Sequence, residues 1–484
     1  MNILKRPRSV DGGPLLFTNK GLVSIIVPLM IQQVLTVAVG AVDTVMVAYA
    51  GEAAVSGVSL VNTLDVLLVM FFSSLVTGGA VVVAQTLGRK NMDDARSAAK
   101  QLLYVATAMA LLVTVTVLTF RKPLLSLLFG SAEADVMYSA ERYFFFVALS
   151  FPFLAIHSGV ASIFQVSGNS VISMTVSFVT NLINRGGNAL FIIALGKGSA
   201  GAAIATLICR IVGAGIMLVL INRKNHIFYI EKLLHYKPDL KVIKEILRIG
   251  VPNGIENGMF QFGRLLTQSL ISSMGTATIA ANAVALTISN FQYMAGSAYS
   301  SAMITVVGRC VGAKEIEQAK YYSRLMAVLN YITLWMIVLV TVVFLSPIVS
   351  LYDLSAESSA IACQLIIYHS VCAAIMWPIG FMLPSAFRAA GDVRFPLIVS
   401  VITMWIFRVA GSYVLALDTV SVFGLFSFKG LGMGVMGVWV AMTVDWVFRA
   451  ALFLVRYLSG RWLLQKDKKD NKKEGKNRLL SAKR

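Results

Sequence analysis

Long runs of apolar residues dominate the chain and alternate with short polar segments. Each run has about 20 or more residues, the length that an α-helix needs to cross a bilayer. None shows the period-two alternation of a membrane β-strand. The pattern predicts an all-α polytopic membrane protein with twelve transmembrane helices. Their expected limits are residues 22–50, 55–87, 98–119, 141–165, 171–195, 200–222, 247–272, 280–308, 321–345, 362–386, 395–417 and 434–458.

The second half of the chain repeats the first. Apolar helices that carry acids, in two similar halves, are typical of secondary transporters. The twelve helices are therefore expected to form two pseudo-symmetric six-helix lobes. At offsets of 223 or 224 residues, segments 28–32, 83–88, 168–169 and 184–185 correspond to segments 252–256, 307–312, 391–392 and 407–408.

Charge is concentrated in the tails and in alternate loops, and the net charge is +19. This is the distribution that the positive-inside rule describes, not that of a nucleic-acid-binding surface. It predicts a multi-pass protein of the cell inner membrane with both termini in the cytoplasm. Residues 231–247 are expected to form an amphipathic helix at the membrane interface. The predicted domains are an N-terminal tail (1–21), an N-lobe (22–222), a cytoplasmic inter-lobe loop (223–246), a C-lobe (247–458) and a basic cytoplasmic tail (459–484).

The amino-acid composition excludes several other classes of protein. With 57% hydrophobic and 13% charged residues, the chain is too apolar for a water-soluble globule of this length. The sequence has neither a Walker A motif nor a cluster of ligands with zinc spacing. We therefore expect no enzyme and no cofactor, and any transport should be driven by an ion gradient.

Four acidic residues fall within the expected helices: Asp43, Asp65, Glu256 and Asp445. An ionised side chain at the bilayer centre costs about 2.5–3.5 kcal/mol, so such residues usually serve a function. Asp445 is the exception, because Arg449 follows four residues later and can pair with it. Asp65 has no evident partner within its own helix.

Asp43 and Glu256 are the stronger functional candidates. Each follows a proline in its own helix, Pro28 and Pro252 respectively. Proline frees a backbone carbonyl and bends a helix, which suits a segment that lines a cavity or moves.

Polar uncharged residues add further candidates. Asn184 and Asn188 are four residues apart, so they share one helix face. Their oxygens can ligate a hard cation or hydrogen-bond a carboxylate, and interhelical hydrogen bonding is the alternative. His369 is an isolated intramembrane histidine and a candidate for a proton path.

Several segments resemble one known family. VDTVMVAYAGEAAVSGVSL (42–60), GVPNGIENGMFQFGRLL (250–266) and SAFRAAGDVRFP (385–396) are similar to motifs of the multidrug and toxic compound extrusion (MATE) family, over essentially residues 15–460. The resemblance implies two six-helix lobes that work by rocking-type alternating access. It also implies export of amphiphilic, often cationic, organic compounds in exchange for sodium ions or protons.

The resemblance also implies a cation-coupling site. The family positions fall on Asp43, Asn184, Asn188 and Thr206, where Na⁺ is one candidate ligand. Asn188 stands where many members have an aspartate. The span 7 glutamate of other members matches Glu256, but its usual aspartate partner in span 10 has no match. Span 10 offers only His369, so Glu256, Asp65 and His369 are secondary cation or substrate candidates.

The sequence therefore predicts a secondary exporter of small organic molecules, monomeric in the lipid bilayer, with no nucleic-acid partner. One alternative is a flippase of lipids or lipid-linked sugars with a related fold. A second is a membrane enzyme or receptor without transport activity. Because the expected site has a single carboxylate, we predict protons as the coupling ion, with sodium as the alternative.

Overall fold

A computed structural model describes residues 15–49, 51–130, 133–224, 228–230, 237–422 and 426–463, and it leaves the side chains of 38–45, 47–48, 52–53, 420–422 and 426–428 undescribed. The chain divides into two compact units. The first unit is Phe17–Gly254, and the second is Ile255–Arg484 together with Met1–Leu16. A hydrogen bond of 2.9 Å from the Leu16 amide to Gln318 Oε1 ties Leu16 to the second unit.

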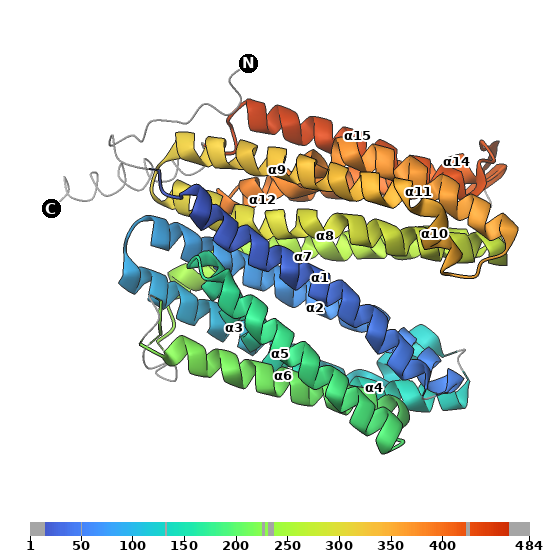
Figure 1. The fold of residues 1–484 in the computed structure, drawn as a ribbon, viewed down its shortest axis with the longest axis horizontal. Helices are drawn as coiled ribbons and strands as arrows, with labels where there is room; N and C mark the ends of the chain where they lie inside the picture. The colour runs from blue at the N-terminus through green and yellow to red at the C-terminus, as the bar shows by residue number, and fades with distance from the viewer. Residues whose placement is uncertain are drawn as a thin grey trace. The chain divides into compact units, whose positions relative to one another are not determined.

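The first unit holds six helical segments (Figure 1). Their limits match the apolar runs closely, except that the third extends well beyond its expected range of 98–119 and the fourth begins seven residues before its expected start at 141. Charged residues at both ends continue this helix, with Asp93 and Asp94 in its first turn. The segments are α1 (Asn19–Ala48), α2 (Glu52–Gly88), α3 (Met92–Phe129), α4 (Ala134–Val166), α5 (Ser170–Asn188) with η1 (Ala189–Ala194), and α6 (Gly198–Asn222).

Helix α7 (Leu240–Ser272) belongs to both units. It starts after Asp239, whose Oδ1 accepts hydrogen bonds from the Lys241 and Val242 amides at 2.9 and 3.3 Å. The helix expected at 231–247 is therefore, from residue 240 onward, the first part of α7, while residues 231–236 lie outside the described residues. A Cβ on Gly78 of α2 would meet the Gly250 nitrogen at 2.6 Å, so this part of α7 packs directly on α2.

The rest of the second unit continues the helical pattern, and two of its spans contain π-helical turns. These irregular turns interrupt the α-helical register at Trp377 and Thr403. The segments are α8 (Thr276–Gly312), α9 (Ile316–Val343), α10 (Leu345–Ser350), α11 (Ala356–Trp377) with η2 (Pro378–Met382) and α12 (Leu383–Ala389), α13 (Arg394–Thr403) with η3 (Met404–Ala410) and α14 (Gly411–Ala416), and α15 (Gly434–Leu458).

One short hairpin departs from the all-α expectation. Strands β1 (Thr419–Val422) and β2 (Phe426–Lys429) pair antiparallel, with Val420 opposite Phe428 and Val422 opposite Phe426. β-Branched and aromatic residues favour this pairing. The hairpin lies in the connection between α14 and α15.

The internal repeat extends to backbone conformation. Helices α2 and α8 have the same length, and a glycine with φ near +90° precedes each, Gly51 and Gly275. Lys90 and Lys314, which follow the ends of these helices, are both left-handed, with φ of 60° and 62°. Later in the chain, Gly196 and Gly198 correspond to Gly432 and Gly434 at an offset of 236. The larger offset reflects an insertion in the second unit at the hairpin.

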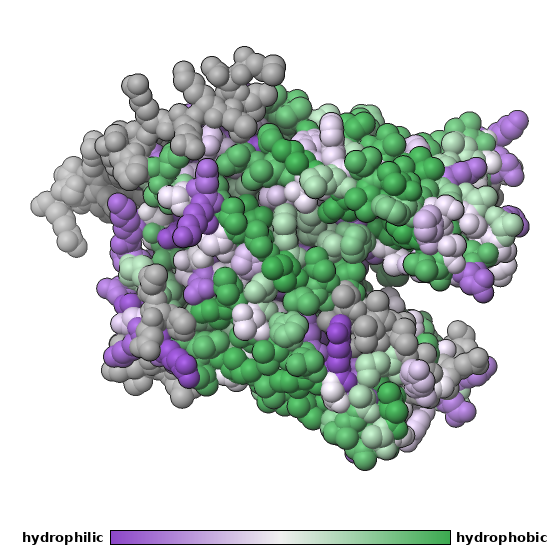
Figure 2. Space-filling model, viewed as in Figure 1, coloured by the Kyte–Doolittle hydropathy of each residue, from purple (hydrophilic) through white to green (hydrophobic). Residues whose placement is uncertain are grey.

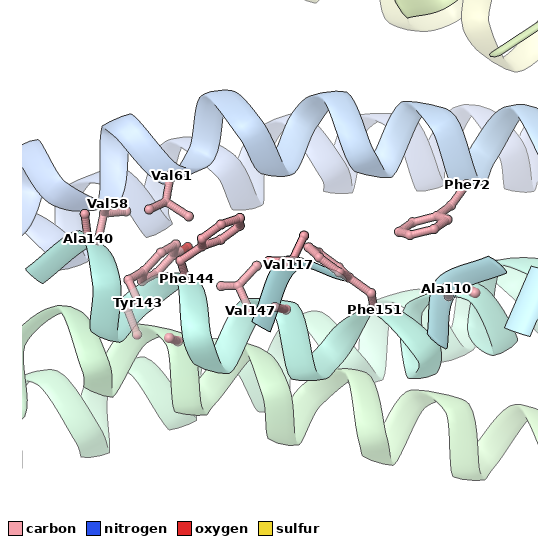
Figure 3. Packing of buried hydrophobic residues seen from close by; sticks show 14 of the residues in the cluster. Val58, Val61, Phe72, Ala110, Val117, Ala140, Tyr143, Phe144, Val147 and Phe151 are labelled. Atoms are coloured by element: carbon pink, nitrogen blue, oxygen red, sulfur yellow. The ribbon is translucent and has the colours of Figure 1, made fainter. Parts of the chain in front are cut away.

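The core of the first unit lies between α2, α3 and α4. Figure 3 shows Val58, Val61 and Phe72 of α2 opposite aromatic and aliphatic side chains of α4. The Phe72 and Phe151 rings lie 5.7 Å apart between centroids. On the visible face, hydrophobic residues cover the flanks of the helices and hydrophilic ones gather at their ends (Figure 2). This is the surface that a bilayer requires.

Among the described residues, nine helices are long and apolar enough to cross a membrane. The chain is thus a multi-pass membrane protein. The three expected spans outside this set are those of α5, α7 and α8. They are richer in asparagine, serine, glycine and charged residues, as the span 5 sequence TNLINRGGN illustrates. Orientation of the termini and the domain limits stay predictions.

Candidate functional site: intramembrane polar clusters

The first cluster contains three of the four residues expected to form the coupling site. Asn184 and Asn188 lie on α5 and Thr206 lies on α6, and both asparagines are buried. Asn184 Nδ2 donates to Thr206 Oγ1 at 3.4 Å, and Asn188 Nδ2 donates to Asn184 Oδ1 at 3.4 Å. The fourth residue, Asp43, lies in α1, but its side chain is outside the described residues.

Small residues allow this close approach of α5 and α6. A Cβ on Gly187 would meet the Ala205 Cβ at 2.9 Å, one residue away from both Asn188 and Thr206. Immediately after Asn188 the helix changes to the π-helical turn η1. Such turns occur often at functional sites, because they re-aim the side chains around them.

The second cluster supplies Asp65 with a partner that its own helix lacks. Asp65 Oδ2 lies 3.5 Å from Arg210 Nη2, and Arg210 Nη1 donates to Ser150 Oγ at 2.7 Å. Arg210 comes from α6, one turn after Thr206, so the ion pair and the asparagine cluster share a helix face. The other carboxylate oxygen of Asp65, Oδ1, is buried and accepts no hydrogen bond from the described residues.

The third cluster surrounds Glu256. Arg388 Nη2 donates to Glu256 Oε2 at 2.8 Å, and Ser400 Oγ donates to Glu256 Oε1 at 2.8 Å. Both carboxylate oxygens are therefore engaged. Sequence reasoning identified the glutamate but not its partners, because Arg388 is 132 residues away.

The first unit contains the same arrangement without charge. Gln32 Nε2 donates to Ser177 Oγ at 3.1 Å, and Gln165 Nε2 donates to Gln32 Oε1 at 3.5 Å. Gln32, Gln165 and Ser177 precede Glu256, Arg388 and Ser400 by 224, 223 and 223 residues. The Glu256–Arg388 ion pair is thus the charged equivalent of a neutral amide contact.

His369 lies apart from Glu256, and the two share no contact among the described residues. Its Nε2 forms a short hydrogen bond with the Tyr293 hydroxyl. The rings of Trp439 and Trp446 each lie 5.4 Å from the imidazole between centroids. Asp445 forms the expected pair with Arg449, at 3.3 Å between Oδ1 and Nη2.

The helix-bend candidates Pro28 and Pro252 lie inside α1 and α7, as their sequence positions require.

The sequence did not predict the ion pair between Asp392 and Arg456. Asp392, in the loop after α12, is fully buried and lies 2.8 Å from Arg456 Nη2. Burial raises the pKa of Asp392, and the hydrogen bond and charge of Arg456 oppose this rise.

Comparisons with known proteins agree with this architecture. The MatE family model matches residues 28–190 and 252–414, two segments related by the internal repeat. Among relatives, a probable multidrug resistance protein NorM of Thermotoga maritima is 26% identical over 92% of this chain and 93% of its own. The uncharacterized transporter YisQ of Bacillus subtilis is 25% identical over 90% and 93%.

Solved structures share the fold. An outward-facing multidrug resistance MATE family transporter of the MOP superfamily superposes with a TM-score of 0.82 at 18% identity, over 93% of this chain and 96% of its own. A MOP superfamily transporter from Pyrococcus furiosus superposes with a TM-score of 0.80 at 19% identity, over 91% and 95%. With a family model that covers both halves, the chain belongs to the MatE family of membrane transporters.

Proposed function

We propose that this transporter exports amphiphilic, often cationic, organic compounds from the cell, in exchange for an inward-moving ion. The name of the Thermotoga maritima relative, a probable multidrug resistance protein, supports this activity. The observation that carries the coupling half of the proposal is the buried Asn184–Asn188–Thr206 cluster. Polar side chains at such depth are usually retained for function.

The coupling ion in this proposal is the proton, carried by Asp43. Sodium needs several oxygen ligands, and negative charge on them offsets the cost of dehydrating the ion. Asn184 Oδ1 already accepts a hydrogen bond from Asn188, so part of the oxygen supply is in use. A proton needs only one carboxylate whose surroundings alternate between wet and dry. Neutral asparagines do not compete for that proton.

The test is dye export from proteoliposomes, first with a pH gradient and no sodium, then with a sodium gradient alone. We expect export with the pH gradient and its loss in Asp43→Asn. Export that requires sodium and ignores the pH gradient would contradict proton coupling.

A gain-of-function variant sharpens this test. Asn188→Asp adds a second carboxylate to the cluster, so it should make export respond to sodium. Asn222→Asp, at the exposed C-terminal end of α6 and sixteen residues after Thr206, is the matched control and should not. An identical sodium response in the two variants would show that the cluster does not select the ion.

A second candidate function is transport of a lipid or lipid-linked sugar. Unpaired intramembrane acids would repel an anionic headgroup, but Asp65, Glu256 and Asp445 each pair with an arginine. The binding pocket of the Pyrococcus furiosus transporter has a reversed polarity, which suggests a different function for that protein. Translocation of a labelled anionic lipid across vesicles, without dye export, would favour this candidate.

A further inference from the structure

Four arginines gather within the helices of the second unit, and among the described residues only two of them have an acidic partner. Arg388 pairs with Glu256, and Arg449 pairs with Asp445. The other two are Arg264 of α7 and Arg408 of η3. Neither guanidinium forms a hydrogen bond or an ion pair with any described residue. Among the charges described here, the cluster has an excess of two positive charges.

Arg408 is the more deeply placed of the two, with an exposed fraction of 8%. Its guanidinium carbon lies 5.2 Å above the centroid of the Phe260 ring. It is close enough to Arg264 for the two positive charges to repel each other, while Asp445, already paired with Arg449, attracts it. A buried charge without a counter-ion is strongly destabilising, so this arrangement favours binding of an anion.

The backbone holds Arg264 and Arg408 close together. A Cβ on Gly263 would overlap the Met404 side chain of η3, so α7 and η3 pack in direct contact beside the two arginines. The π-helical turn η3 contains Arg408 itself. The cluster is therefore part of the packed helices and not a set of surface side chains.

Aromatic rings line the same region. Tyr293 lies near both Arg264 and Arg408, and its ring stacks on Trp377 at 5.3 Å between centroids and 13° between planes. Trp377 in turn stacks on Phe381 at 5.6 Å, and Phe381 lies 6.3 Å from Phe260. Guanidinium groups and aromatic rings therefore lie side by side in this cluster.

This chemistry selects a particular ligand. A guanidinium offers planar paired donors that match the two oxygens of a carboxylate or phosphate. Aromatic walls favour a flat apolar body next to that group. Resting on the proposed export function, we propose that Arg264 and Arg408 form a binding site for the oxyanion group of an amphiphilic aromatic substrate. The transporter then accepts zwitterionic and anionic compounds in addition to cations.

The test compares a rhodamine dye that bears a free carboxylate with its methyl ester, which differs only at that group. Binding is measured by fluorescence anisotropy on the purified full-length protein in phosphatidylcholine nanodiscs, so the result does not depend on the coupling ion. We expect Arg408→Gln and Arg264→Gln each to weaken carboxylate binding by about tenfold or more, with little change for the ester. Arg408→Lys, which keeps the charge but loses the paired donors, should lie between.

The matched control is Arg142→Gln, which removes the same group from an exposed position on α4. It should leave the preference between the two dyes unchanged. An equal loss for carboxylate and ester in the Arg264 and Arg408 variants would overturn the proposal, and so would a wild-type protein that does not bind the carboxylate. Export of the ester alone would still support the proposed function, so the two failures are distinguishable.

A further measurement distinguishes a lipid phosphate from a soluble substrate as the occupant of this site. Phosphatidic acid is added to the nanodiscs, and carboxylate binding is measured again. Competition in the wild type that disappears in Arg408→Gln would show that a lipid phosphate occupies the same site. Absence of competition would assign the site to the soluble substrate. Both results support an oxyanion site.

Discussion

Gln32 with Gln165 and Ser177 is the repeat equivalent of Glu256 with Arg388 and Ser400. This correspondence allows a test of the role of Glu256. Changing Glu256 to Gln and Arg388 to Gln together gives the second unit the neutral side chains found at Gln32 and Gln165. If the ion pair is structural, each single variant should be damaging and the double variant should be tolerated. If Glu256 carries the coupling proton, the double variant should fold but fail to export.

The structure sets the size of the effect. At 2.8 Å and an effective dielectric constant of about 20, the Glu256–Arg388 attraction is about 6 kcal/mol. The two side chains are only 9% and 14% exposed, so desolvation offsets most of this. Removal of one partner leaves a buried charge, and should lower the free energy of unfolding by about 3–5 kcal/mol. The double variant should lie within about 1 kcal/mol of the wild type.

The free energy of unfolding can be measured by titration with SDS in mixed micelles, alongside dye export in proteoliposomes. The reverse substitution is the matched control. Gln32→Glu alone should destabilise the first unit, and Gln165→Arg added to it should restore much of the loss. Additive losses in the Glu256→Gln, Arg388→Gln double variant would refute the structural assignment, because the two residues would then not act as a pair.

Three further predictions follow from packing, burial and charge. Gly296→Ala places a Cβ where the Trp377 ring lies, and should lower the free energy of unfolding by about 1–3 kcal/mol. Gly258→Ala on α7, where a Cβ meets open space, is the control and should be neutral or stabilising. Equal losses for the two variants in SDS titrations would contradict the close packing of Trp377 on Gly296. Burial raises the pKa of Asp392, so the folded state binds the carboxyl proton more tightly than the unfolded state does. The contribution of Asp392 to the free energy of unfolding should therefore fall as the pH rises above the ordinary pKa of 3.8 and through the raised pKa. Thermal unfolding in detergent across acidic pH should show this slope, and Asp392→Asn should remove it; an unchanged slope would exclude Asp392 as its source. In a background without the four native cysteines, Asp353→Cys should react with an impermeant thiol reagent on intact cells and Arg89→Cys only after lysis, and the opposite pattern would reverse the orientation.

Sequence reasoning located the helices well, because lipid requires long apolar runs and such runs are visible in one dimension. The last expected span, 434–458, coincides with α15. The third was too short, since hydropathy detects only the apolar part of a helix, and α3 continues through charged turns at both ends. The β1–β2 hairpin was missed because four-residue strands leave little periodic signal.

Whether a side-chain partner could be predicted depends on how far apart the two residues lie in the sequence. Asp445 and Arg449 are one helical turn apart, so their pairing was predictable. Asp65 and Arg210, like Glu256 and Arg388, meet only because helices far apart in the sequence pack together. A single sequence shows which charges must find partners in the membrane, but not which partners they find. Candidate roles assigned to lone acids are therefore the least secure part of sequence reasoning.

The repeat adds one more constraint on mechanism. At an offset of 224, the position of Asp43 corresponds to Thr267, so the second unit carries no acid there. Arg408 of η3 corresponds to Arg185 at an offset of 223, so both units carry an arginine there, whereas Arg264 corresponds to Gly40 at an offset of 224. Two units built on the same backbone plan have thus diverged in charge at two positions, where the first has Asp43 and Gly40 and the second has Thr267 and Arg264. A transporter that moved only cations would gain nothing from unpaired arginines within the membrane, where each is costly. Divergence of this kind is expected if the two units act on different charges, with an ion bound by the first and an anionic group of the substrate by the second.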